Sequence, residues 1–116
     1  MSFKPIDFLK IADDLLKDKN YDHPAGYRTV IGRAYYGCFL CSRDRLGLQK
    51  WQPRKGKKRV EIHKIVIGTL KSKDGMKGDF LSKLRRKRND ADYDMDLTVG
   101  KDDAIYAIKL AKRITV

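Results

Sequence analysis

Apolar residues recur at intervals of three and four along most of the chain, which is the spacing of one face of an α-helix. No segment shows the strict alternation of apolar and polar residues that a half-buried strand would show, and no hairpin turn lies between two such segments. We therefore expect an all-α fold, namely a compact bundle of four to five helices.

Turn and capping residues divide this pattern into helices. The first helix is predicted to begin near Pro5 and to end at 18–20, and the second to run from Pro24 to Leu46 with Gly47 as its C-cap. Because the second helix is the most apolar, we expect it to lie at the centre of the bundle. Its small residues should let neighbouring helices approach closely; they are Gly26, Gly32, Ala34 and Gly37.

The other helices are shorter or more charged. The third is predicted over about 60–71, the fourth over about 77–93, and the last after Thr98, a candidate N-cap. The positions expected to face the core are Phe8, Ile11, Ala12, Leu15 and Leu16 in the first helix, Ile62, Ile65, Val66 and Leu70 in the third, and Ile105, Ile108, Ala111 and Ile114 in the last.

The length and composition indicate one soluble domain that covers residues 1–116. The chain is 41% hydrophobic and 36% charged, and it shows no internal repeat. Its longest uncharged stretch, 34–42, is far shorter than the ~20 residues of a membrane-spanning helix. Asp7 interrupts the segment where a signal peptide would be apolar, so we expect a cytoplasmic protein with no membrane association.

Positive charge is concentrated in the middle of the chain. Lysine and arginine total 27 against 15 acidic residues, and 43–88 holds 17 of these cations but only four of the acids. Such an excess attracts polyanions through phosphate contacts and counterion release. Nucleic acid is therefore the predicted class of partner, and a basic surface that only keeps the protein in solution is the alternative.

Two segments carry the predicted nucleic-acid-binding residues. One is a basic loop at about 48–59, in which the indole of Trp51 could stack on an unpaired base. The other is a helical run that precedes Arg88. The predicted contacts are Lys50, Trp51, Arg54, Lys55, Lys57, Lys58 and Arg59 in the loop, and Arg85, Arg86 and Lys87 in the helix.

Arg88 occupies a position where an apolar residue is expected. The apolar seam of its helix reads Leu81, Leu84, Arg88 and Ala91, at steps of three, four and three. A guanidinium on such a seam is costly unless it is paired or faces a cleft. Two roles remain open: a structural ion pair with Asp92, four residues later, or a functional group that forms a phosphate-binding cluster with its neighbours.

Two segments together resemble the paired signatures of HEPN domains. They are Arg-Ala-Tyr-Tyr-Gly-Cys-Phe at 33–39 and Leu-Arg-Arg-Lys-Arg-Asn-Asp-Ala-Asp-Tyr-Asp at 84–94. The order of the helices matches as well, so the resemblance covers roughly Pro5 to Ile114. It implies an antiparallel helical bundle that forms a homodimer, in which the Arg-Asn motifs of two copies face each other across a cleft. It also implies RNA cleavage or a nucleotidyltransferase partner, as in toxin and antitoxin pairs.

In the nuclease branch of that family, an Arg, a polar residue and, after three more positions, a His act on RNA without metal. The Arg would stabilise the charge on phosphorus while the His assists proton transfer from the 2′-hydroxyl. The matching residues here are Arg88, Asn89 and Tyr93, and tyrosine, with a reference pKa near ~10, is a poor base at neutral pH. A metal-independent endoribonuclease and a non-catalytic nucleotide-binding or protein-interaction module therefore both stay open.

Other candidate groups are expected to be structural. His23 and His63 are predicted to be surface or capping residues, and Cys38 and Cys41 to be buried free thiols. The acids Asp90, Asp92, Asp94 and Asp96 do not match a calcium loop, so we expect no metal and no cofactor. Tyr35 and Tyr36 are expected to be core or dimer-contact aromatics.

Overall fold

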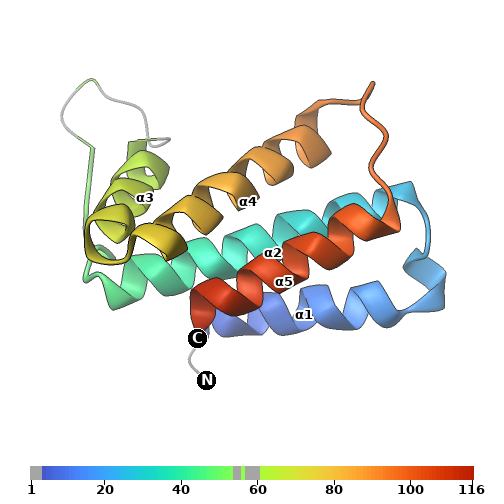
Figure 1. The fold of residues 1–116 in the computed structure, drawn as a ribbon, viewed down its shortest axis with the longest axis horizontal. Coiled ribbons are helices and arrows are strands. Elements are labelled where there is room, and N and C mark those ends of the chain that lie inside the picture. The colour runs from blue at the N-terminus through green and yellow to red at the C-terminus, as the bar shows by residue number, and fades with distance from the viewer. Residues whose placement is uncertain (1–3, 54–55, 57–60) are drawn as a thin grey trace.

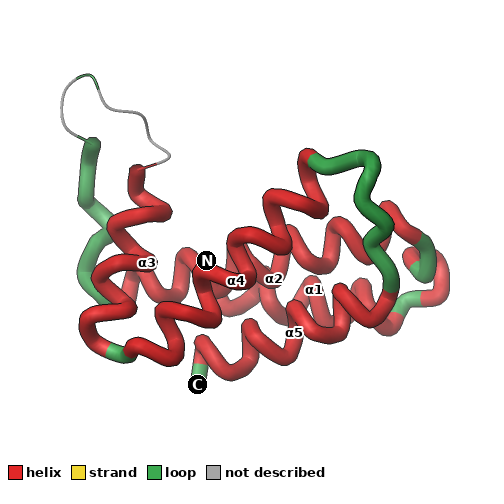
Figure 2. Tube along the Cα trace, turned by 45° about the horizontal axis from the view of Figure 1, so that its top comes forward, coloured by secondary structure: helices red, strands yellow, loops and turns green. Residues whose placement is uncertain are grey.

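The computed structural model describes residues 4–53, 56 and 61–116, and the regular elements in these ranges are all helical (Figure 1). The helices are α1 (Ile6–Lys17), α2 (Pro24–Arg45), α3 (Glu61–Lys73), α4 (Gly75–Tyr93) and α5 (Lys101–Thr115), with a 3₁₀ turn, η1 (Lys19–Tyr21), between α1 and α2. Figure 2 shows the same arrangement from a second direction, with loops between helices and no strand in the described ranges. The all-α bundle is confirmed.

The long helix α2 lies at the centre of the bundle, as its apolar composition predicts. It packs against α1, α4 and α5, and α3 packs on α4 (Figure 1). The helices α1, α2, α4 and α5 alternate in direction, so the bundle is antiparallel. Ile31, Tyr35 and Cys38 of α2 are no more than 1% exposed, because the surrounding helices cover them from several sides.

The close approach of α1 to α2 depends on Gly37, one of the small residues predicted to allow it. A Cβ at position 37 would lie 3.0 Å from the backbone nitrogen of Leu9 and 3.3 Å from Cβ of Phe8. Leu9 and Ala12 face α2 and are buried. The prediction that Ile11 is buried is wrong, because its side chain lies on the outer face of α1 and is 47% exposed.

Carboxylates of Asp74 and Asp103 accept hydrogen bonds at the N-termini of α4 and α5. The side chain of Asp74 accepts a hydrogen bond from the Lys77 backbone at 3.1 Å, so α4 begins two residues before the predicted start. The prediction that Thr98 caps the last helix is wrong. The N-cap of α5 is Gly100, whose backbone N–H donates to the Asp103 carboxylate at 2.9 Å, so this carboxylate satisfies the first turn.

The helices α3 and α4 form a tight hairpin around Gly78. A Cβ at this position would lie 2.6 Å from Cα of Lys71, so a larger residue could not be accommodated without a backbone shift. The two helices lead away from this crossing, and His63 in the first turn of α3 lines one hollow with Arg85 and Arg88 in the second half of α4. Arg85 and Arg88 of α4 and His63 at the start of α3 therefore share one surface.

Candidate functional site

Arg88 interrupts the buried seam of α4 as the sequence predicts. Leu81, Leu84 and Ala91 are at most 2% exposed, whereas the Arg88 side chain is 20% exposed. Its Nε lies 3.0 Å from Oδ2 of Asp92, and its Nη1 donates to Oδ1 of the neighbouring amide, Asn89, at 3.2 Å. The predicted pairing four residues apart is therefore present, and it is only partly shielded from water.

The structure brings Arg88, Asn89 and Tyr93 together. The guanidinium carbon of Arg88 lies 5.8 Å from the ring centroid of Tyr35 and 5.7 Å from that of Tyr93, within reach of a cation–π interaction with each. Tyr35 is fully buried, whereas Tyr93 is 71% exposed. Arg88 thus lies between the buried ring of Tyr35 and the ring of Tyr93, which is exposed to solvent.

These residues line an open hollow of about 590 Å³, which we call the Arg88 hollow. Its walls come from α3, from α4 and from the residue that follows α4. They are formed by His63, Arg85, Arg88, Asn89, Asp90, Tyr93 and Asp94. The guanidinium is thus not sealed in the core. It faces a solvent-filled space in which two arginines and a histidine lie together.

The sequence prediction for His63 is wrong. This residue is neither a cap nor a simple surface group, because it is half-buried and its ring stacks on Phe39 with centroids 4.2 Å apart. Its Nδ1 lies 2.6 Å from the hydroxyl oxygen of Tyr35. Burial, and then the charges of Arg85 and Arg88, lower the pKa of His63 to about 4, so the imidazole is neutral at neutral pH.

Tyr35 is a core aromatic, as predicted, and it also orients the histidine. Its ring stacks on His63 with centroids 5.7 Å apart, and burial raises the pKa of its phenol, so the hydroxyl stays protonated. The neighbouring Tyr36 is half-buried and packs edge-on against Phe8 of α1, with centroids 6.0 Å apart. The two adjacent tyrosines therefore point to different sides of α2.

A second depression, of about 450 Å³, continues from the Arg88 hollow along α3 and α4; we call it the basic groove. It is lined by Lys64, Ile67, Gly68, Lys71, Ser82, Arg85, Arg86 and Asn89, and it shares Arg85 and Asn89 with the Arg88 hollow. Arg85 and Arg86 are residues that the sequence predicts to bind nucleic acid. Lys64 and Lys71 were missed, although their spacing of seven residues places both on one face of α3.

Lys87 lies apart from these residues. Its ammonium is 3.8 Å from Oδ1 of Asp103 and 4.9 Å from the ring centroid of Tyr106, both on α5. One residue corresponds to about 100° around a helix, so Lys87 faces α5 while Arg86 and Arg88 face other directions. The prediction that 85–87 acts as one binding segment is therefore not what the geometry provides.

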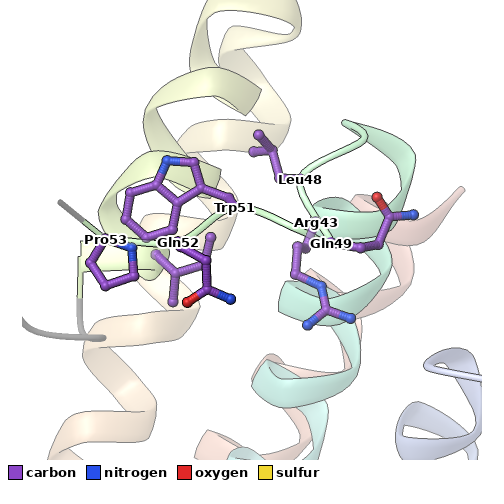
Figure 3. A pocket seen from close by; sticks show the side chains of 7 residues that line it. Arg43, Leu48, Gln49, Trp51, Gln52 and Pro53 are labelled. Carbon is purple, nitrogen blue, oxygen red and sulfur yellow. The ribbon is translucent and has the colours of Figure 1, made fainter. Parts of the chain in front are cut away.

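Most of the predicted basic loop lies outside the described residues, namely Arg54, Lys55, Lys57, Lys58 and Arg59. Lys50 is exposed. Trp51 lines a separate hollow of about 140 Å³ together with Arg43, Leu48, Gln49, Gln52, Pro53 and Ile62 (Figure 3). Figure 3 shows the indole beside Gln52 and Pro53, whereas Arg43 lies on α2 and Gln49 lies just after the end of that helix. Ile62 belongs to the first turn of α3, which also carries His63 of the Arg88 hollow, but the two hollows share no lining residue.

Arg28 of α2 holds the end of α4 and was not singled out from the sequence. Its Nη1 donates to the carbonyl oxygens of Asp90, Ala91 and Asp94 at 3.3, 2.8 and 3.0 Å, and its Nη2 donates to that of Leu97. The last carbonyl groups of a helix lack intrahelical partners and carry partial negative charge, so a cation stabilises them. Arg28 thereby fixes the segment that follows the Arg-Asn motif.

Other candidate groups are structural. Cys38 is buried and Cys41 half-buried; both are free, and burial raises the pKa of each thiol. No group of three metal-type side chains gathers in 4–53, 56 or 61–116. In the same ranges, no helix is both long and apolar enough to cross a membrane.

Comparison with known proteins yields a similar sequence without a described function. The chain is 34% identical over 108 residues to the uncharacterized protein MJ0628 of Methanocaldococcus jannaschii. The aligned part covers 81% of this chain and 65% of that protein, so the chain spans slightly less than two thirds of its relative. No protein family model matches the chain. No solved structure matches it.

Proposed function

We propose that the protein is a HEPN-like domain that binds RNA, with a phosphate in the Arg88 hollow and the adjoining backbone along the basic groove. The observation that carries the proposal is the continuity of these two depressions, which share Arg85 and Asn89. Between them they gather five cations on the α3–α4 side of the bundle: Lys64, Lys71, Arg85, Arg86 and Arg88. A row of cations that follows a groove suits a linear polyanion better than a single small anion.

Arg88 can exchange its present partners for a phosphate. Its pair with Asp92 has side-chain exposures of 20% and 36%, and pairs this open to water contribute about 0.2–1 kcal/mol. A guanidinium bond to phosphate is charge-assisted and can be bidentate, which a single carboxylate contact through Nε is not. A phosphate whose other oxygens contact further cations is therefore expected to bind the Arg88 guanidinium more strongly than Asp92 does.

The resemblance to HEPN domains extends this proposal to the assembly. Two copies would face each other across the hollow, which is open to solvent and flanked by the exposed ring of Tyr93. Pairing with a nucleotidyltransferase, a toxin or antitoxin role and a cytoplasmic location belong to the same proposal. Light scattering on a size-exclusion column measures whether the protein is a dimer, and a monomer at all concentrations contradicts this part.

The test of RNA binding is fluorescence anisotropy with an end-labelled single-stranded RNA at several salt concentrations. We expect affinity to fall steeply with salt, and Arg88→Ala to weaken binding about tenfold, the effect of losing one charge-assisted hydrogen bond. Lys64→Ala in the basic groove should reduce the salt slope by roughly the ~0.7 of one phosphate contact to a single strand. Lys10→Ala, an exposed lysine on α1, is the matched control and should change neither quantity.

Two results would contradict the proposal. Absence of binding at low salt removes it, and equal weakening by Lys64→Ala and Lys10→Ala shows attraction to net charge alone. The second candidate function, a non-catalytic module with Arg88 as a structural pair, is favoured by the 3.0 Å contact to Asp92. It predicts that Arg88→Ala lowers stability while RNA affinity stays unchanged.

A further inference from the structure

We infer that the outer groove between α4 and α5 is a docking site for an acidic, amphipathic helix of a partner protein. This α4–α5 groove is a hollow of about 410 Å³ lined by Phe80, Tyr106, Lys109, Leu110, Lys112 and Arg113. It shares no lining residue with the Arg88 hollow or the basic groove. The inference therefore goes beyond the proposed function and does not depend on it.

Contacts between α4 and α5 mark the two ends of the α4–α5 groove. At one end, Nζ of Lys77 on α4 donates to the carbonyl oxygen of Val116 at 2.5 Å. At the other end, the ammonium of Lys87 lies 3.8 Å from the Asp103 carboxylate and 4.9 Å from the ring centroid of Tyr106. The rise of α4 from Lys77 to Lys87 is roughly 15 Å, or about three helical turns. A groove of this length can hold several turns of a second helix.

The base of the α4–α5 groove is apolar although it lies on the outside of the bundle. Leu110 is buried, Phe80 is half-buried, and the Tyr106 side chain is 43% exposed. One turn before Phe80 on α4, the side chain of Met76 is exposed as well. Apolar groups of this kind gain free energy when a second apolar surface removes them from water, and exposed patches of them mark interaction sites. The occupant should therefore be apolar on one side.

Cations without a partner lie beside this apolar base. Lys83 follows Phe80 by three residues on α4, and Lys109 and Arg113 lie one turn apart on α5. All three cations are exposed, and none forms an ion pair or side-chain hydrogen bond with another described residue. Unpaired cations beside an apolar groove favour an occupant that carries carboxylates next to its apolar face.

The charge and shape of the face disfavour two other occupants. A second copy would bring the same cations to the interface, and the chain holds 27 lysines and arginines against 15 acids, so two such faces repel each other. RNA gains most from a row of cations along its backbone, which the basic groove provides. The α4–α5 groove instead has a buried leucine, Leu110, among its lining residues. An acidic amphipathic helix matches both the apolar base and the cations.

The probe is a labelled synthetic peptide of about 18 residues, which is long enough to form a helix in water. It carries leucine at helical spacing on one face and glutamate on both sides of that face. Fluorescence anisotropy measures its binding to the full chain at physiological salt. A scrambled peptide has the same composition and charge but no apolar face, and we expect it to bind at least about tenfold more weakly, because it buries less apolar surface.

Variants of the protein locate the binding. Tyr106→Ala should weaken binding of the acidic peptide at least about fivefold, the effect of losing an aromatic anchor in an interface. Tyr21→Ala is the matched control and should leave it unchanged, since Tyr21 is 44% exposed and lies on η1, outside the groove. Lys109→Glu should weaken binding at least as much through repulsion of the glutamates, whereas Lys10→Glu on α1 should change it less than about twofold.

Several results overturn the inference. Absence of peptide binding at about 100 μM protein does so, because helix-in-groove docking at physiological salt should be detectable there. Equal binding of both peptides, or equal weakening by Tyr106→Ala and Tyr21→Ala, shows attraction to net charge alone. A dimer that dissociates in Tyr106→Ala assigns the groove to a second copy, and loss of RNA affinity in this variant assigns it to RNA. The proposed RNA binding is tested separately through Arg88, which does not line this groove.

Discussion

Replacing Arg28 should test whether one side chain of α2 holds the end of the helix that carries the Arg-Asn motif. The guanidinium donates to carbonyl oxygens of Ala91 and Asp94 at 2.8 and 3.0 Å, and it reaches Asp90 and Leu97 as well. In Arg28→Ala, all four carbonyl groups lose a charged donor, and those of Ala91, Asp94 and Leu97 become dependent on water, whereas that of Asp90 keeps the backbone N–H of Asp94 at 3.0 Å. We expect the end of α4 to fray and the free energy of unfolding to fall.

The size of this effect follows from the contacts. A buried hydrogen bond to a charged group contributes about 1.5–3 kcal/mol, and a cation at a helix C-terminus about 0.3–1 kcal/mol where it is exposed. Arg28 is half-buried and water can replace part of its bonds, so we expect a loss of about 2–3 kcal/mol rather than the sum of four bonds. For a domain of this size that is a decrease in Tm of roughly 6–12 °C.

The assay is urea unfolding followed by circular dichroism at constant pH. Arg28→Lys should lose about half as much as Arg28→Ala, because one ammonium cannot reach as many carbonyl groups as the guanidinium fork. Arg113→Ala is the control, since Arg113 makes no hydrogen bond or ion pair with another described residue, and its effect should stay within about 0.5 kcal/mol. Equal stabilities of Arg28→Ala and Arg113→Ala would refute the reasoning.

Two further predictions concern packing and pH. Gly78→Ala should lower the free energy of unfolding by about 1–3 kcal/mol, because its Cβ would press on the backbone of Lys71. Gly68→Ala, whose Cβ meets nothing within 4 Å, should raise it by up to about 1 kcal/mol. Thermal melts of both variants measure these changes. The pKa of His63 is lowered from 6.5 to about 4 in the folded protein, so the unfolded chain binds a proton that the folded one does not. The stability due to the neutral histidine is complete above pH 6.5 and is lost as the pH falls toward 4. The urea midpoint of the wild type should therefore fall more over this range than that of His63→Gln, and parallel curves would contradict the pKa shift.

Local sequence signals account for much of the fold. Pro24, Gly47 and the apolar run of α2 were sufficient to place the central helix, because caps and helical periodicity act within a few residues. The prediction that Thr98 caps α5 was wrong, because the carboxylate of Asp103 accepts the hydrogen bond from the backbone N–H of Gly100. Which residue caps a helix depends on the competing side chains nearby rather than on the helical pattern of apolar residues.

The site was predictable only in part. Arg88, Asn89 and Tyr93 lie within two turns of one helix, so the sequence could group them. His63 could not be joined to them from sequence, because its contact with Tyr35 spans 28 residues and depends on how the α3–α4 hairpin crosses at Gly78. Tertiary packing of this kind leaves no periodic signal in the chain.

The contact between Arg88 and Asp92 also sets a threshold for ligands. Asp92 already supplies Arg88 with a carboxylate at 3.0 Å, so an incoming anion must displace an internal competitor whose pair with Arg88 contributes about 0.2–1 kcal/mol. A small monoanion such as chloride or acetate exchanges one charge for another and gains little. A polyanion meets the neighbouring cations at the same time, and only such a ligand gains enough to release Asp92. In the proposed RNA-binding role, Asp92 thus favours polyanions over small monoanions at Arg88.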